Sequence, residues 1–390
     1  MQVYKSYGRG RPNLNVVRAD QWRFYLDCLC RPAELFYTRE QIAVARPFGD
    51  SLRPPTFHAM QPTLPPDYFD QIKKQSEENV RLRAERRRTL WSKDIAREVR
   101  LVAWIDILGF SDELLRATTD DEYRAVYRKM LRVHDEFGHP HANDEPEQQD
   151  KINRDFGREV LVLSDGLIVT ATPNAAARRV MPAYDLLMDF IQDIQWAQAN
   201  CAANGIFLRG GISIGPYHYD DDILLSPALI RAYRLESKRA CFPVIIINAK
   251  DMAQLAALSG AEDHGAPHQL VRPFKSPAQK RGERFFFIDY LDYLRWPNNH
   301  GWFSDADRKA HARSRDAKAR NRIFTTSHRK EAARFMRLHK RHLMAAFQGA
   351  VSPRVKAKYR WLMKYQNRAL QGFPAVFNSA RIDLASLSEG

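Results

Sequence analysis

LVAWIDILGFS (residues 101–111) joins an apolar run to a glycine turn. The run predicts a buried strand over Val99–Ile107, and the glycine turn predicts that a helix begins near Ser111. Asp106 ends this strand, where a carboxylate is poorly placed for core packing but well placed to bind a hard cation. Backbone N–H groups of the turn, at Gly109 and Phe110, can meanwhile hold phosphate oxygens.

Strands and helices are expected to alternate on the C-terminal side of this stretch. A hairpin is predicted from Glu159–Leu163 and Gly166–Ala171, turning at Ser164-Asp165. Further strands are expected at Phe207–Ile214, Val244–Asn248 and Arg284–Tyr290, and helices at about Ser111–Phe137, Asn174–Asn204, Ser226–Arg239 and from Ala249. This alternation is typical of an α/β or α+β domain.

Asp165 is the second candidate metal ligand, because it lies at the hairpin tip between two apolar strands. If its strand is a neighbour of the strand ending at Asp106, the two carboxylates converge. Two carboxylates and a nucleotide triphosphate are ligands that magnesium and manganese prefer, and two such ions can promote attack on a phosphate. The alternative is that each aspartate only caps a turn or a helix.

Four motifs in order resemble class III adenylyl and guanylyl cyclases. Trp104–Ser111 resembles their F-x-D-I-x-G-F-[ST] signature, and Leu163–Gly166 lies where those enzymes carry G-D. Arg209–Gly215 matches R-x-G-I-x-x-G, and Ala232–Leu235 matches the A-x-R-[LM] of the helix with the transition-state arginine. The resemblance implies an α+β fold with a ferredoxin-like core and a central sheet flanked by helices. Helical composition on both sides of this core predicts helical N- and C-terminal extensions.

A closer resemblance is to the pyrimidine cyclases of Pycsar antiphage systems. Its phrases are Asp106–Ser111, Leu208–Gly215, Pro227–Ser237 and a tail from Val355 to Asn367. It covers roughly residues 97–370 and not the first ninety or so. It implies a second messenger in defence against phage, which acts on a separate effector.

The resemblance also implies roles for individual residues. Asp106, Asp165 and the carbonyl of Ile107 are expected to hold two Mn²⁺ or Mg²⁺ ions, and Gly109 and Phe110 to bind phosphate. Arg234 is expected to stabilise charge in the transition state. Because relatives place the aspartates and the arginine on opposite subunits, a homodimer with composite active sites is implied. Candidates to hold the β- and γ-phosphates are Lys280, Arg281 and Arg284.

Three positions depart from the purine cyclases, one of them Ser226, where a glycine is expected. Adenylyl cyclases have lysine, and guanylyl cyclases glutamate, four residues before the second metal aspartate, where this chain has Leu161. Ile230 stands where the ribose-orienting asparagine is expected, and Asp222 is a candidate for reading a base edge, with a solvated hairpin tip as the alternative. Without the purine-reading pair, UTP or CTP is the expected substrate, cyclised to the 3′,5′-cyclic nucleotide. A degenerate cyclase-fold protein that binds nucleic acid, or a cyclase that uses a purine triphosphate, stays an alternative.

Charge and hydropathy limit the class of protein. The formal net charge of +15 suits a polyanionic partner, and Arg9–Pro12 matches the core of an AT-hook. So short a match occurs easily by chance, and nucleic acid is not the expected partner. No apolar run approaches the roughly 20 residues that span a bilayer, and the first residues lack an apolar signal stretch, so a cytoplasmic protein is expected.

Three regions are predicted. Residues 1–96 form an N-terminal extension with a proline-rich linker and a basic helix. Residues 97–295 form the catalytic domain, and residues 296–390 form a basic helical C-terminal region.

Overall fold

The computed structural model describes residues 73–75, 77–82, 85, 97–138, 146–220, 223–261, 270–292 and 304–387. The described residues from 97 onward belong to one compact unit, and the earlier ones, which are helical, belong to another. Asp222 and the AT-hook-like Arg9–Pro12 lie outside the described residues.

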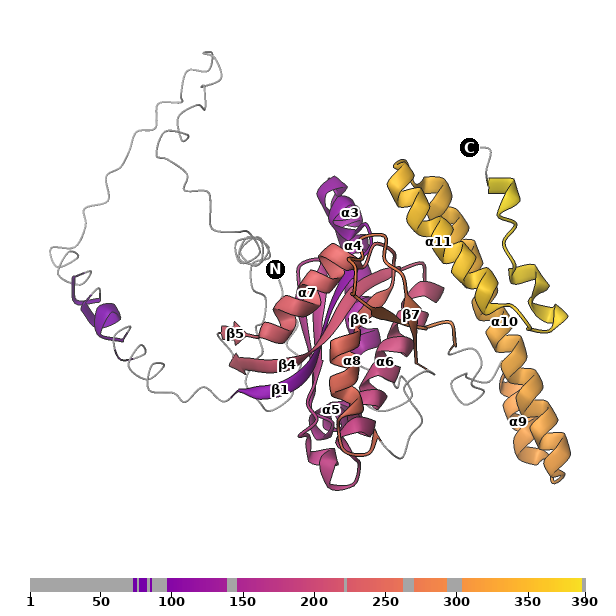
Figure 1. Cartoon of the computed structure of the whole chain (residues 1–390), viewed down its shortest axis with the longest axis horizontal. Coiled ribbons are helices and arrows are strands. Elements are labelled where there is room, and N and C mark those ends of the chain that lie inside the picture. Colours follow the sequence, from indigo (N-terminus) through magenta and orange to yellow (C-terminus); the bar gives the residue numbers. More distant parts are fainter. Residues whose placement is uncertain are drawn as a thin grey trace, which may run out of the picture. The chain divides into compact units, whose positions relative to one another are not determined.

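The larger unit is built on one mixed sheet (Figure 1). Its strands are β1 (Glu98–Ile107), β2 (Arg158–Leu163), β3 (Gly166–Ala171), β4 (Leu208–Asp220), β5 (Ile223–Leu225), β6 (Ile245–Asn248), β7 (Val271–Phe274) and β8 (Phe285–Ile288). The strand order is β2-β3-β1-β4-β6-β8-β7, with β5 paired to β4. Of these pairings, only the one between β4 and β6 is parallel.

Helices flank this sheet. They are α3 (Phe110–Arg116), α4 (Asp120–Gly138), α5 (Pro146–Asp155), α6 (Ala183–Ala203), α7 (Pro227–Arg239), α8 (Ala249–Ala256), α9 (Asp305–Arg313), α10 (Ala317–Gly349) and α11 (Pro353–Ala369), with 3₁₀ turns at Ala176–Arg179, Ala375–Ala380 and Ala385–Leu387. From β1 to β4 the elements follow the β-α-β-β-α-β order, and the sheet order β2-β3-β1-β4 is that of a ferredoxin-like core. The predicted α+β class and ferredoxin-like core are therefore confirmed.

The predicted strands and most predicted helices are confirmed, but some boundaries differ and some elements were not predicted. The helix expected from Asn174 begins only at Ala183, because Pro182 lacks an N–H and disfavours helical backbone in the residue before it. The strand expected to end at Ile214 continues to Asp220. The polar helix α5 and the strands β5 and β7 were not predicted. β7 contains Pro273, which a sheet tolerates at its edge, and β7 is the last strand in the order.

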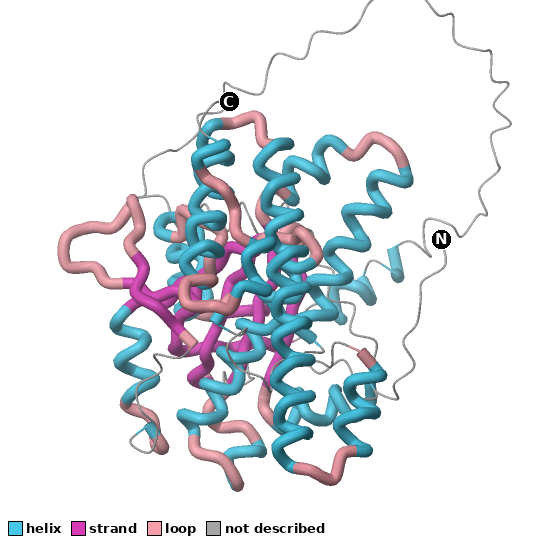
Figure 2. The backbone as a smooth tube through the Cα atoms, turned by 90° about the vertical axis from the view of Figure 1, so that its right-hand side faces the viewer, coloured by secondary structure: helices cyan, strands magenta, loops and turns pink. Residues whose placement is uncertain are grey.

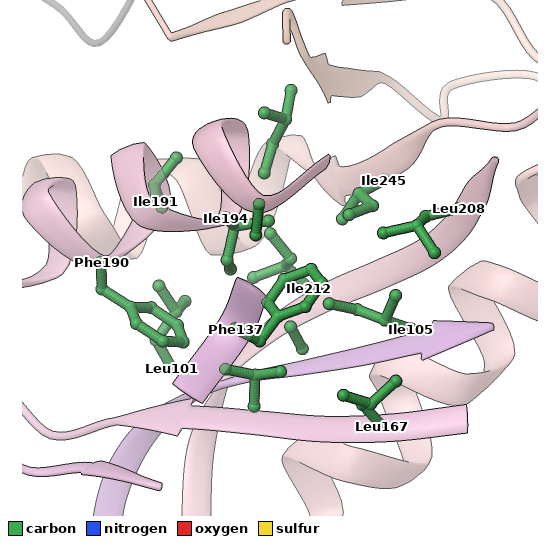
Figure 3. Close-up of a cluster of buried hydrophobic side chains, with 14 of the residues drawn as sticks. Leu101, Ile105, Phe137, Leu167, Phe190, Ile191, Ile194, Leu208, Ile212 and Ile245 are labelled. Atoms are coloured by element: carbon green, nitrogen blue, oxygen red, sulfur yellow. The ribbon is translucent and has the colours of Figure 1, made fainter. Parts of the chain in front are cut away.

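Alternate residues of β1 face opposite layers of helices. Leu101, Ala103, Ile105 and Ile107 join a buried cluster with α4 and α6, part of which Figure 3 shows. Val102 and Trp104 instead pack with Ala228, Leu229 and Ala232 of α7. Since side chains alternate along a strand, Asp106 lies on the α7 face of the sheet.

The C-terminal helices share a core with the sheet. In Figure 2, viewed from the side on which they lie in Figure 1, α10 and α11 stand in front of the strands. Trp361 of α11 stacks on Phe242, with ring centroids 5.0 Å apart, and meets the rings of Phe274 and Phe287 edge-on. Described residues on both sides of the predicted domain boundary near residue 295 contribute to one buried cluster. The position of that boundary therefore stays a prediction.

Candidate functional site

Asp106, near the end of β1, and Asp165, in the turn between β2 and β3, lie at one end of the sheet. In the antiparallel register of β1 and β3, Asp106 is opposite Gly166, the residue after Asp165. The N–H of Ile107 donates to the carbonyl oxygen of Asp165, with 3.4 Å between nitrogen and oxygen. β1 and β3 are therefore neighbouring strands, which is the arrangement that brings the two carboxylates together.

The Asp165 side chain is held by the first helix after β1. It is only 9% exposed, and the hydroxyl of Ser111 in α3 donates to its Oδ2 at 2.6 Å. The backbone at Ser164 has a φ of 48°, which makes the hairpin turn tight. Two elements thus fix where this carboxylate lies.

The turn after β1 has the shape that the sequence predicts. Gly109 adopts a φ of 81° and caps the N-terminus of α3, where Phe110 begins the helix and is buried. The N–H of Leu108 donates to the carbonyl of Phe207 at 2.9 Å, which ties the turn to the start of β4. Phosphate binding by the Gly109 and Phe110 amides stays a prediction.

Arg209 belongs to the site but was not predicted from the sequence as a site residue. It lies opposite Asp106 in the register of β1 and β4, and its Nη2 donates to Asp106 Oδ2 at 2.9 Å. The same nitrogen pairs with Glu236 of α7, which is 4% exposed. The sequence signal was available, because Arg209 is the first residue of the R-x-G-I motif.

Arg234 and Arg284 come together in a separate basic cavity. This cavity, of about 440 Å³, lies where α7 faces the loop before β8. Its basic lining residues are Arg231, Arg234, Lys238, Arg239, Lys250 and Arg284. Neither Asp106 nor Asp165 is among the residues that line it.

The position of the missing base-reading lysine or glutamate and the position of the missing ribose-orienting asparagine are both apolar. Leu161 in β2 is half-buried and packs against the cluster that contains Trp104 and Leu163. Ile230 is half-buried on α7, one helical turn before Arg234.

The described residues contain no group of three or more histidine, cysteine, aspartate or glutamate side chains arranged to hold a metal ion. Asp106 and Asp165 nevertheless fit the protein's share of a magnesium or manganese site. Both carboxylates lie at adjoining strand ends, and a bound triphosphate would supply further oxygens.

Comparisons with known proteins give the following. No protein-family model and no curated protein matches the sequence. Among solved structures, one of a bacterial light-regulated adenylyl cyclase is 13% identical, with a TM-score of 0.31 over 66% of this chain and 69% of that one. A second, described in the same words, is 13% identical, with a TM-score of 0.29 over 56% and 64%. Likenesses this low establish nothing alone.

None of the described helices is long and apolar enough to cross a bilayer.

Proposed function

We propose that this chain is a class III nucleotide cyclase, which converts a nucleoside triphosphate into a 3′,5′-cyclic nucleotide and pyrophosphate. The observation that carries this proposal is the meeting of Asp106 and Asp165 at adjoining strand ends, beside Arg209. If each aspartate only capped a turn or a helix, it would need neither a paired neighbouring strand nor an arginine beside it. A site for metal ions and a triphosphate uses both features.

The residues divide the chemistry between them. Asp106, Asp165 and the Ile107 carbonyl would hold the two divalent ions, which, when bound, make the 3′-hydroxyl more acidic and offset charge on pyrophosphate. Arg209 lies beside Asp106, where its guanidinium is placed to donate to phosphate oxygens. The amides of Gly109 and Phe110 bind phosphate at the start of α3. Arg234 donates to the α-phosphate as charge develops there.

A homodimer is part of this proposal. In the proposed dimer the aspartates of one subunit act with Arg234 of the other, and this is supported by the finding that neither aspartate lines the cavity of Arg234 and Arg284. Each active site is then composite, as in the family that the sequence resembles.

UTP or CTP is the proposed substrate. Leu161 and Ile230 offer no hydrogen bond to a purine or to ribose, and a site that lacks a base-reading donor loses its preference for that base. The role in antiphage defence, with a separate effector that responds to the cyclic nucleotide, rests on the sequence resemblance.

The purified chain is incubated with each of the four ribonucleoside triphosphates and Mn²⁺, and any cyclic product is identified by mass spectrometry. We expect cyclic UMP or cyclic CMP from the wild type, and none from Asp106→Ala or Asp165→Ala. Asp121→Ala is the matched control, because this side chain is 91% exposed on α4, and it should retain full activity.

The outcomes separate the candidate functions. If the main product is a purine cyclic nucleotide, the proposed pyrimidine substrate is wrong and the proposed enzyme class stands. Full activity in either site variant would remove the proposed metal site. No product from any nucleotide, together with salt-sensitive nucleic-acid binding, would favour the degenerate cyclase-fold protein.

A further inference from the structure

The N-terminal half of α11 lies at the strand ends that form the candidate site. The ring of Tyr359 meets the ring of Phe207 edge-on, with centroids 5.6 Å apart. Phe207 immediately precedes β4 and accepts the hydrogen bond from Leu108, just after β1. Leu108 itself packs against the cluster that contains α10 and α11. The helix is therefore anchored at the point where β1 ends and β4 begins.

Lys358, the residue before Tyr359, lies among the charged groups of the site. Its side chain is half-buried. Burial lowers its pKa, as do the positive charges of Arg209 and Arg354, while Asp106 and Glu236 act in the opposite direction. The ammonium group is thus within electrostatic range of the pair that Arg209 forms with both carboxylates.

Lys358 has no anion of its own. Within the described parts of the chain it forms no ion pair and no hydrogen bond, and the nearby Asp106 and Glu236 are already paired with Arg209. A half-buried cation without a partner costs free energy, which a bound anion would recover. Arg354, one helical turn earlier on the same face of α11, adds a second positive charge. A small anion with several charges suits this arrangement.

We propose that Lys358 binds the β- or γ-phosphate of the substrate in the site of its own subunit, and then the pyrophosphate that leaves. This inference rests on the proposed cyclase function. In the reaction the 3′-oxygen forms a bond to the α-phosphorus, and the hydroxyl proton passes to water. The bond from the α-phosphorus to the oxygen bridging to the β-phosphate breaks, and its electron pair stays on pyrophosphate. The ammonium of Lys358 stabilises that growing charge.

This assignment makes the C-terminal helix part of the catalytic site. Arg284, one of the residues expected from the sequence to hold phosphate, lines the cavity of Arg234, and neither aspartate lines that cavity. Lys358 lies on the side of the aspartates, so the two basic groups would approach a triphosphate from different subunits.

The test uses inorganic pyrophosphate as the probe and the full chain as the protein. Isothermal titration calorimetry measures pyrophosphate binding, and steady-state kinetics measures KM for the triphosphate. Lys358→Ala should weaken pyrophosphate binding and raise KM by about 10- to 100-fold, as loss of a hydrogen bond to a charged group predicts. Lys358→Arg should restore most of the binding, because it keeps a cationic donor.

Lys364→Ala is the matched control, since it removes an exposed lysine from the same helix and should leave both measurements unchanged. Equal pyrophosphate affinity in Lys358→Ala and wild type, at equal melting temperature, would overturn the inference, as would equal losses in Lys358→Ala and Lys364→Ala. If Lys358→Ala does not fold, the inference is decided by Lys358→Arg, whose failure to bind pyrophosphate overturns it. A wild type that binds pyrophosphate through Lys358 but forms no cyclic nucleotide would refute the proposed function and leave the phosphate site standing.

Discussion

Gly211 sets the distance between β4 and α7 at the back of the candidate site. A Cβ atom at this position would lie 2.2 Å from the carbonyl oxygen of Ala232 and 2.6 Å from the Cβ of Leu235. Those distances are below van der Waals contact, and one of the atoms is helix backbone that cannot rotate away. The close approach lets Glu236 of α7 reach Arg209 of β4.

Gly211→Ala should therefore destabilise the protein by about 3 kcal/mol, the usual upper range for overpacking, because α7 must move away from the sheet. The free energy of unfolding, measured with urea, gives the value directly. Gly349→Ala is the control: its Cβ would meet nothing within 4 Å at the end of α10, and alanine there should be neutral or stabilise by up to about 1 kcal/mol. Equal stability of Gly211→Ala and wild type would show that the contact is not tight.

At the scale of elements, one buried histidine of α10 joins this helix to α11 and to Tyr290, two residues after the end of β8. The Nε2 of Gln366 donates to the carbonyls of Met336 and Ala380. Its Oε1 must then accept from His339 Nδ1, at 2.6 Å. That leaves His339 Nε2 to accept from the Tyr290 hydroxyl at 2.9 Å. The neutral imidazole satisfies both partners, whereas a protonated ring would lose the bond from Tyr290.

A pH dependence of stability follows from this histidine. Burial lowers the pKa of His339 to about 4, so between pH 6.5 and 4 the unfolded chain binds a proton that the folded chain does not. Stability from this group is complete above pH 6.5 and is lost as the pH falls toward 4. The advantage of wild type over His339→Gln should therefore narrow by up to about 3 kcal/mol over this range.

The measurement is the free energy of unfolding of both proteins at a series of pH values. Only the difference between them is diagnostic, because burial raises the pKa of Asp193 to about 7, and this gives both proteins a slope of opposite sign. A difference that does not change with pH would mean that His339 is protonated in the folded protein or still neutral in the unfolded chain.

The C-terminal helices should also be required for folding. Leu362, Met363 and Tyr365 of α11 are buried against Phe287 and its neighbours. A chain that ends at residue 350 would expose that apolar surface, so we expect it to aggregate rather than to form an active core. Solubility and size-exclusion chromatography test this, and a monodisperse, active shortened chain would contradict it.

The sequence predicted the parts of the fold that depend on local pattern. The hairpin at Asp165 and the strand ending at Asp106 follow from apolar runs and turn residues. Their pairing was only a condition in the sequence reasoning, and the register of β1 and β3 meets it. The contacts of Arg209 with Glu236 and the position of Lys358 could not be predicted. They depend on how closely α7 and α11 pack against the sheet, which no local pattern determines. β7 was missed because Pro273 interrupts a run of only four residues.

At the scale of the whole molecule, the proposed homodimer with composite sites predicts complementation between variants at Asp106 and Arg234. Asp106→Ala and Arg234→Ala should each be inactive, because each removes one half of every composite site. In a heterodimer of the two variants, one site carries both substitutions and the other carries neither. Random exchange of equal amounts makes about half of the dimers mixed, so about a quarter of the wild-type sites should be intact.

The variants are mixed, unfolded and refolded together, and the cyclic product is measured against wild type treated in the same way. A mixture of Asp106→Ala with Asp165→Ala is the control, since both substitutions affect the same half of the site and no exchange can rebuild it. Recovery of about a quarter of the activity in the first mixture alone supports the composite site. Equal recovery in both mixtures, or in neither, would place Arg234 and the aspartates in sites that do not form across two subunits.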